Sequence, residues 1–304
     1  MKVLLEGSFD DDERAQWLAA LSAAMPEAQW LDSAAARDAT ADVRSTIQAA
    51  VVANPAPGSL QGLPALQLIQ SLWAGVDRLL ADPTLPTGVP IARMVDPAMN
   101  AAMAETVLWA VLSLHRGMFV YARRQREGVW QVHTQRRADE VRVLVLGNGQ
   151  MGRTASACIA QQGYSISSWR RDGSDLDLLL PQADIVVNLL PLTEHTRGLL
   201  NQQFFAALPP KASIVNLARG AHVVDADLLD ALDSGHLRHA VLDVFHTEPL
   251  PTDHRYWQHP RVTLLPHAAA GTDARSAAAV AVANLRALRD GAELRHLVDP
   301  GRGY

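Results

Sequence analysis

A glycine-rich turn near the middle of the chain constrains its fold more than any other feature. The apolar run 141–146 leads directly into a Gly-x-Gly-x-x-Gly string, and a helical stretch follows as far as Ala160. In such a turn the first glycine permits the sharp bend, the second lets the backbone approach a pyrophosphate, and the third lets helix and strand pack closely. The unpaired N–H groups of the helix start would bind the pyrophosphate. The string therefore predicts a dinucleotide site formed by Gly147, Gly149, Gln150, Met151 and Gly152.

Short apolar runs alternate with helical stretches on both sides of this turn. The stronger series consists of residues 141–146, 164–169, 184–190, 213–217, 239–245 and 262–265. Most of these runs are continuously apolar, as strands buried on both faces of a parallel sheet are. A weaker series precedes them, at 3–5, 28–31, 49–53, 66–72 and 89–95. The alternation predicts an α/β fold, with a Rossmann-type doubly wound parallel sheet and a smaller α/β domain.

Pro97 marks the expected boundary between the two series. Proline disfavours helix in the residue before it, so the long helical pattern of 98–116 begins afresh after Asp96. A charged segment at 123–130, broken by Gly128, is expected to form an irregular arm. An alanine-rich helix at 273–290 follows the last strand of the stronger series and has no strand of its own.

Composition excludes several classes of function. A chain of 304 residues is long enough for two domains, and its net charge of -5 argues against a surface that binds nucleic acid. One cysteine, Cys158, excludes an internal disulfide and suits a reducing compartment. The apolar N-terminal run and the stretch 277–283 are too short for a signal peptide or a membrane span, so we expect a cytoplasmic protein. The histidines show no metal-ligand spacing, and no metal is expected.

The residues after the second strand of the Rossmann-type sheet indicate the cofactor. NAD-binding proteins place a carboxylate there for the ribose 2′-hydroxyl, whereas an arginine accommodates a 2′-phosphate. This chain has Trp169, Arg170 and Arg171 at that point, and no carboxylate before Asp172. The two arginines could be surface residues only, but the pattern favours NADP(H) over NAD(H).

Three polar side chains follow three successive strands of the same predicted sheet. Arg219 follows the run 213–217, Glu248 follows 239–245, and His267 follows 262–265. Ligands of open α/β sheets bind outside the carboxyl ends of the strands, so these side chains can converge on one crevice. Either Arg219 or His267 alone could be a structural residue. Together they suit reduction of a 2-oxo acid, because arginine can bind a carboxylate and histidine can donate a proton.

These motifs resemble the D-2-hydroxyacid dehydrogenase family from about Leu66 to the C-terminus. The resemblance is carried by Leu-Ala-Arg219-Gly, Asp243-Val-Phe-x-x-Glu248-Pro-Leu-Pro, Pro266-His267 and Asn188-Leu-Leu-Pro191-Leu-Thr. Within that family, Trp169-Arg-Arg, Trp257-Gln-His-Pro-Arg and the terminal Arg-Gly-Tyr are similar to glyoxylate/hydroxypyruvate reductases.

The resemblance implies roles for individual residues. Arg219 would orient the substrate, Glu248 would pair with His267, and His267 would donate the proton. Further cofactor contacts would come from Leu190, Pro191, Ala218 and Asp243, the last also acting as a supporting carboxylate. The substrate loop would be Trp73, Ala74, Gly75 and Val76, whose amides receive the carboxylate, although a smaller residue than Trp73 is expected there.

The resemblance also implies an architecture and an activity. Residues 97–272 would form the dinucleotide-binding domain, and 1–96 with 273–304 a flavodoxin-like substrate domain closed by the C-terminal helix. The activity would be NADPH-dependent reduction of glyoxylate or hydroxypyruvate in a cleft between the domains of a homodimer. The arm at 123–130 would make dimer contacts, and Trp130 or Tyr304 could line the pocket. Two alternatives are a dinucleotide-sensing regulator without turnover and an NAD-linked dehydrogenase of a bulkier 2-hydroxy acid.

Overall fold

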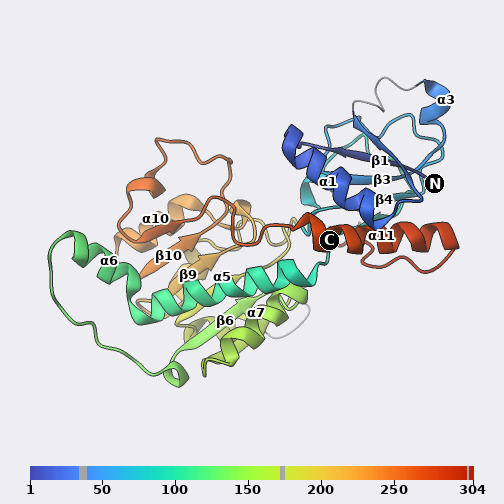
Figure 1. Ribbon diagram of the computed structural model, residues 1–304. Helices are drawn as coiled ribbons and strands as arrows, with labels where there is room; N and C mark the ends of the chain where they lie inside the picture. Colours follow the sequence, from blue (N-terminus) through green and yellow to red (C-terminus); the bar gives the residue numbers. More distant parts are fainter. Residues whose placement is uncertain (34–39, 172–174, 300) are drawn as a thin grey trace. The chain divides into compact units, whose positions relative to one another are not determined.

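The computed structural model describes residues 1–33, 40–171, 175–299 and 301–304 (Figure 1). Asp172, which figured in the choice of cofactor, lies outside these ranges. The chain divides into two compact units: unit 1 comprises Met1–Met99 and Thr272–Tyr304, and unit 2 comprises Asn100–Gly271. Each unit is an α/β structure built on one parallel sheet.

Unit 2 contains a six-stranded sheet in the order β11-β10-β9-β8-β6-β7, all of it parallel. Its strands are β6 (Arg142–Leu146), β7 (Ser165–Trp169), β8 (Ile185–Asn188), β9 (Ser213–Asn216), β10 (His239–Leu242) and β11 (Val262–Leu264). The strand order reverses between β6 and β8, because β7 pairs on one side of β6 and β8 on the other. In open α/β sheets ligands bind outside the carboxyl ends of the strands at such a switch point.

Helices cover both faces of this sheet, as expected for a doubly wound fold (Figure 1). They are α5 (Pro97–Arg116), α6 (Met118–Arg126), α7 (Gln150–Ala160), α8 (Leu176–Leu179), α9 (Gln202–Ala207) and α10 (Asp225–Asp233), with 3-10 turns η1 (Ala138–Glu140), η2 (Leu180–Gln182), η3 (Gly220–His222) and η4 (Arg255–Gln258). Strands β8, β9 and β10 are buried along their whole length. This burial explains why most of their residues are apolar.

Helix α5 is long and apolar enough to span a bilayer if length and composition alone are considered. Half of its most apolar stretch is buried within the structure. Val107, Ala110 and Val111 have no exposed surface and pack into one of the two cores of unit 2. Its apolar composition therefore serves a core helix of a globular unit.

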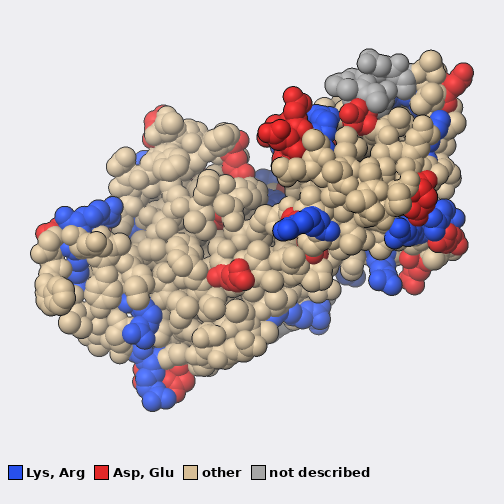
Figure 2. Space-filling view, viewed as in Figure 1, with Lys and Arg blue, Asp and Glu red and all other residues tan. Residues whose placement is uncertain are grey.

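The prediction of an irregular arm at residues 123–130 is partly wrong. Residues Arg123 to Arg126 are the last turn of α6, and the chain leaves regular structure only from Glu127 onward. Gly117, in a left-handed conformation with φ 71°, separates α6 from α5. Arginine and glutamine are good helix formers, so a high charge density did not prevent the helix. Figure 2 shows basic side chains where α6 carries Arg123, Arg124 and Arg126.

Unit 1 contains a five-stranded parallel sheet in the order β2-β1-β3-β4-β5. Its strands are β1 (Lys2–Gly7), β2 (Gln29–Asp32), β3 (Ile47–Ala53), β4 (Leu68–Ser71) and β5 (Ile91–Ala92), and its helices are α1 (Asp11–Ala24), α3 (Ala41–Arg44), α4 (Asp77–Leu80) and α11 (Ala274–Asp290). The order 2-1-3-4-5 is that of flavodoxin-like folds.

Helix α11 returns the C-terminal segment to unit 1 (Figure 1). Its small buried residues, including Ala277, Ala278 and Ala281, allow it to pack closely beside α1 and β4. Buried Asn284 donates from Nδ2 to Gln70 Oε1 of β4 at 2.7 Å. This bond satisfies two polar groups that would otherwise be buried without a partner. The alanine-rich helix thus belongs to the sheet of unit 1 and not to that of unit 2.

Candidate active site

The glycine-rich turn joins the carboxyl end of β6 to the start of α7. Gly147 has φ 110°, and a Cβ atom there would lie 2.8 Å from the carbonyl oxygen of Leu189. A Cβ on Gly152 would lie 1.9 Å from the carbonyl oxygen of Gly147. A side chain at either position would therefore displace backbone. The two glycines are required by the left-handed turn and by the close packing of α7 on β6.

The middle glycine has space around it. Gly149 precedes α7, and a Cβ atom there would meet nothing within 4 Å. Gly149 provides no side-chain hydrogen bond to the start of α7, whose first N–H groups have no acceptor within the helix. Gln150 is exposed beside it, and Met151 packs partly into the core. The cradle fits an anionic group such as a pyrophosphate.

Arg170 and Arg171 directly follow β7. Trp169, the last residue of the strand, is 9% exposed, whereas both arginines are exposed. The carbonyl oxygen of Trp169 accepts a hydrogen bond from Gly147 N at 2.8 Å, which joins the end of β7 to the glycine-rich turn. The arginines thus begin at the edge of the sheet where the turn lies.

A buried pair of asparagines, which the sequence reasoning missed, lies at the ends of β8 and β9. Asn188 Nδ2 donates to Asn216 Oδ1 at 3.0 Å, and neither residue has exposed surface. Asn188 Oδ1 accepts from Leu190 N, and Asn216 Nδ2 donates to the carbonyl oxygen of Arg219 at 2.9 Å. The pair therefore fixes the two loops that carry the predicted residues Leu190 and Arg219.

His222, also missed, lies between the same two loops with no exposed surface. Its Nδ1 is 3.1 Å from the carbonyl oxygen of Arg219, and its Nε2 is 3.3 Å from that of Pro191. The tautomer decides which of the two oxygens accepts a hydrogen bond. Both contacts draw the loop after β8 toward the loop after β9.

Arg219 occupies the position before η3 and is partly buried. Its Nη1 donates to the carbonyl oxygen of Ala218 at 2.7 Å, which orients the guanidinium. The next residue explains how the loops meet, because a Cβ atom on Gly220 would lie 2.0 Å from the backbone carbonyl carbon of Phe245. Only glycine lets the Arg219 loop approach the loop that leads to Glu248.

His267 and Glu248 form a direct pair. His267 Nδ1 lies 2.7 Å from Glu248 Oε2, and the other carboxylate oxygen accepts from Phe245 N at 2.9 Å. The imidazole side chain is 52% exposed. Among the described residues, no partner contacts His267 Nε2. A ring held through Nδ1 and open at Nε2 is suited to donate a proton to a bound molecule.

Asp243 holds the backbone around His267. Its carboxylate accepts from Ala268 N at 2.7 Å and from Ala269 N at 3.1 Å, and its carbonyl oxygen accepts from His267 N at 2.8 Å. These bonds maintain the left-handed conformation of His267, whose φ is 53°. Burial raises the pKa of the Asp243 carboxyl, and the two backbone N–H groups oppose this effect. Such strained conformations persist only where the surroundings determine them.

The predicted substrate loop belongs to unit 1 and follows β4. Trp73 is partly buried and packs edge to face on Trp17 of α1, with 6.5 Å between the ring centroids. The backbone N–H of Trp73 donates to Ser71 Oγ at 3.0 Å, and its carbonyl oxygen accepts from Met94 N. The indole thus packs partly against α1 of unit 1, which gives a large residue at this position a contact within the unit.

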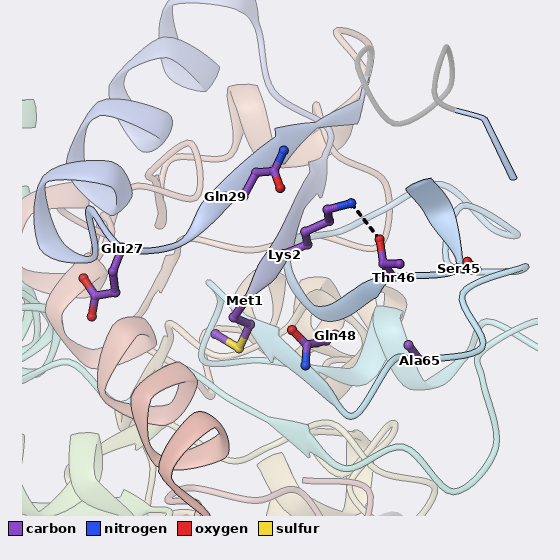
Figure 3. Close-up of a pocket in the computed structure, with 8 residues that line it drawn as sticks. All are labelled: Met1, Lys2, Glu27, Gln29, Ser45, Thr46, Gln48 and Ala65. Carbon is purple, nitrogen blue, oxygen red and sulfur yellow. Dashed lines mark hydrogen bonds between the residues drawn. The ribbon is translucent and has the colours of Figure 1, made fainter. Parts of the chain in front are cut away.

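An open pocket in unit 1 lies at the opposite end of its sheet (Figure 3). It is formed around the amino ends of β1, β2 and β3, where Lys2 Nζ donates to Thr46 Oγ1. The lining residues are Met1, Lys2, Glu27, Gln29, Ser45, Thr46, Gln48 and Ala65. Ligands of parallel sheets bind at the carboxyl ends, so this pocket is not the candidate active site. Within the described ranges, no group of three or more histidine, cysteine or acidic side chains could hold a metal ion.

Unit 2 thus brings together most of the predicted residues at one edge of one sheet. The glycine-rich turn follows β6, Arg170 and Arg171 follow β7, and Leu190 and Pro191 follow β8. The predicted catalytic side chains Arg219, Glu248 and His267 follow β9, β10 and β11.

Comparisons with known proteins agree with this arrangement. The family model described as D-isomer specific 2-hydroxyacid dehydrogenase, NAD binding domain, matches residues 108–269. A glyoxylate/hydroxypyruvate reductase A of Yersinia enterocolitica is 36% identical over 300 residues, which cover 91% of this chain and 96% of that relative.

Two solved structures are similar over nearly the whole chain. A D-isomer specific 2-hydroxyacid dehydrogenase from Xanthobacter autotrophicus, in complex with NADPH and MES, matches with a TM-score of 0.93, 36% identity and coverage of 99% of both chains. An NADPH-dependent glyoxylate/hydroxypyruvate reductase from Sinorhizobium meliloti, in complex with NADP and sulfate, matches with a TM-score of 0.90 and 33% identity, covering 100% of this chain and 99% of the other. With its glycine-rich turn and three strand-end side chains in place, the chain belongs to the D-isomer specific 2-hydroxyacid dehydrogenase family.

Proposed function

We propose that the chain reduces a small 2-oxo acid with NADPH, converting glyoxylate to glycolate and hydroxypyruvate to D-glycerate. The observation that carries the proposal is the 2.7 Å contact of His267 Nδ1 with Glu248 at the sheet edge that also carries Arg219. The relatives named as glyoxylate/hydroxypyruvate reductases support the same choice of substrates.

The cofactor is NADP(H). The cradle around Gly149 has room for the pyrophosphate, and Arg170 and Arg171 would bind the 2′-phosphate. Leu190, Pro191 and Ala218 lie on the loops after β8 and β9, where the nicotinamide end would be bound. NADPH or NADP is present in both of the similar structures described above. NAD(H) is the weaker alternative, because no carboxylate stands at the end of β7.

Each residue of the candidate site would have one task. NADPH, when bound, supplies the hydride that adds to C2 of the oxo acid. Arg219 binds the substrate carboxylate through its guanidinium. His267 transfers a proton from Nε2 to the carbonyl oxygen, and the product is the hydroxy acid.

Glu248 and Asp243 would act through His267. Glu248 accepts a hydrogen bond from Nδ1, so it selects the ring orientation and the nitrogen that carries this proton. Asp243 maintains the backbone conformation that presents the ring. The nicotinamide could also contact Asp243, since each of its oxygens has a second lone pair.

We further propose a cytoplasmic homodimer. Trp130 is 100% exposed and Val132 is 81% exposed, and α5 presents Trp109 and Leu112 at its surface. Large apolar side chains left exposed in this way are expected where a partner subunit covers them. Cys158 is a free thiol, which is consistent with a reducing compartment.

The test is an assay of the purified protein with a panel of 2-oxo acids and both cofactors. We expect NADPH oxidation with glyoxylate or hydroxypyruvate, and a loss of about 100-fold to 10,000-fold in kcat in a His267→Asn variant. Asparagine is the appropriate substitute because it tolerates the left-handed conformation of residue 267 and cannot act as a proton donor of this kind. Normal turnover by this variant would refute the role of His267. Tight binding of NADPH without turnover of any acid would support the regulator instead.

A further inference from the structure

Arg153 lies in the first turn of α7 beside the glycine-rich turn, and the proposed function leaves its side chain without a role. Its Nε donates to the carbonyl oxygen of Asn148 at 3.1 Å, although the residue as a whole is exposed. Within the described part of the chain, no carboxylate pairs with it and neither Nη group makes a hydrogen bond. The guanidinium is therefore fixed at the cofactor loop by one nitrogen, with two nitrogens available to a ligand.

The register of α7 on β7 shows which part of the cofactor Arg153 would meet. Ser156 Oγ lies 3.4 Å from Ser168 Oγ, so these two residues face each other across the helix and the strand. Helix α7 leads from the carboxyl end of β6 to the amino end of β7 and therefore runs antiparallel to the strands (Figure 1). Arg153 lies three residues before Ser156, on the same face of α7. Arg170 lies two residues after Ser168, just beyond β7.

Both steps lead toward the carboxyl edge of the sheet. The helix step covers about 4.5 Å and the strand step about 6.6 Å. Arg153 and Arg170 therefore reach the same edge from the facing Ser156–Ser168 pair, one on the helix and one after the strand. The adenosine ribose of a dinucleotide would be bound near this place, because the residue at the end of the second strand contacts the ribose in such folds.

We propose that Arg153 is a third ligand of the 2′-phosphate of NADP(H), and hence a determinant of selectivity for NADPH over NADH. A phosphate monoester carries a charge of about −1.5 to −2 at neutral pH, and arginine presents parallel N–H donors to it. The contact of Nε with Asn148 orients the fork before binding, so less side-chain entropy is lost when the phosphate arrives. The proposal rests on the proposed function, because it presumes that NADP(H) is the cofactor.

The test compares the binding of NADPH and NADH to wild-type protein and to Arg153→Ala, with cofactor fluorescence as the readout. We expect the Kd for NADPH to rise about tenfold and the Kd for NADH to change by less than about twofold. Arg153→Lys should recover part of the loss, since it restores the charge without the fork. The matched control is Arg142→Ala, which removes an exposed arginine from the opposite, amino end of β6 in the same unit.

Three results would overturn the inference. An equal rise in Kd for both cofactors would assign Arg153 to the pyrophosphate or to the folding of α7. An unchanged Kd for NADPH would show that the Arg153 side chain does not contact the cofactor. An equal rise in the Kd of Arg142→Ala would show that the effect comes from net charge alone. Calorimetry with adenosine 2′,5′-bisphosphate and 5′-AMP gives the same comparison without the nicotinamide. If the wild-type protein itself did not distinguish NADPH from NADH, the proposed cofactor would be wrong, which is a separate result.

Discussion

Replacing His239 by glutamine should reduce the loss of stability that unit 2 undergoes as the pH falls below 6.5. His239 is the first residue of β10 and is 8% exposed, with its ring stacked on Phe119 at 4.5 Å. Its Nε2 lies 2.9 Å from Thr263 Oγ1. Burial, reinforced by the positive charge of Arg238, lowers the pKa of His239 from 6.5 to about 4. The residue is therefore mostly neutral in the folded protein above about pH 5.

The sign and size of the effect follow from proton linkage. Above about pH 7.5, His239 is mostly neutral in both the folded and the unfolded chain and has little influence on the pH dependence. As the pH falls below 6.5, the unfolded chain takes up a proton that the folded chain does not, so the free energy of unfolding decreases. The free energy of unfolding falls by about 3 kcal/mol in total once the pH is below 4. About 2 kcal/mol of this fall occurs between pH 7.5 and pH 5.

Urea titrations of the wild type and of His239→Gln at several pH values measure this difference. Glutamine can still donate to Thr263 and does not titrate, so the free-energy gap between the two proteins should shift in favour of the variant by about 2 kcal/mol between pH 7.5 and pH 5. His195→Gln is the control, because His195 is exposed and its removal should leave the slope unchanged. The reasoning fails if wild type and His239→Gln lose stability in parallel, or if NMR titration finds a pKa near 6.5 for the ring.

Two further predictions concern glycines at the candidate site. Gly152→Ala would place a Cβ atom 1.9 Å from a backbone oxygen. We therefore expect the free energy of unfolding of unit 2, measured in urea, to fall by about 3 kcal/mol. We also expect NADPH binding, measured by cofactor fluorescence, to be lost. Gly220→Ala would push the Arg219 loop away from the backbone of Phe245, so kcat/KM for glyoxylate should fall by about 100-fold while the Kd for NADPH changes by less than about threefold. A Gly220→Ala enzyme with normal kcat/KM would show that the contact between these loops has no bearing on catalysis.

The side chains of the candidate site were predictable where strand ends alone place them. Parallel strands bring their carboxyl ends to one edge, so Arg219, Glu248 and His267 could be assigned to a common site from three apolar runs and the residues after them. The glycine-rich turn was predictable for a similar reason, because its spacing reflects local backbone geometry that Gly147 and Gly152 show directly.

Residues whose roles depend on which strands are neighbours could not be predicted in this way. Asn188 and Asn216 meet only because β8 and β9 pair in register, and neither strand reveals that pairing by itself. A signal was present, since two buried apolar strands each end in asparagine followed by leucine. A polar residue that ends a fully buried strand requires a partner, and the matching position in the next strand is the first place to look for it.

Gly220 illustrates the same limit for loops. Nothing in the residues around it indicates a close approach, because the atoms that exclude a side chain belong to Phe245 and His246, after the next strand. The error at 123–130 has a different origin: charge was taken as a sign of irregular structure, although Arg123 to Arg126 are good helix formers and the helix ends only near Gly128. Local propensity was sufficient there, and it was given too little weight.

The left-handed conformation of His267 shows how the buried carboxylate of Asp243 can position the exposed imidazole of His267. A histidine with φ 53° pays a conformational cost of about 1–2 kcal/mol, and the sequence around residue 267 contains no glycine or asparagine that would suggest it. The cost is offset because Asp243 accepts hydrogen bonds from the two amides that follow and from His267 itself. Its carboxylate accepts the first two bonds, so Asp243 can determine where the imidazole points without touching the ring. Glu248 contacts the ring directly, at Nδ1. The orientation of His267 is therefore fixed by two carboxylates, since Asp243 holds the backbone and Glu248 holds the imidazole.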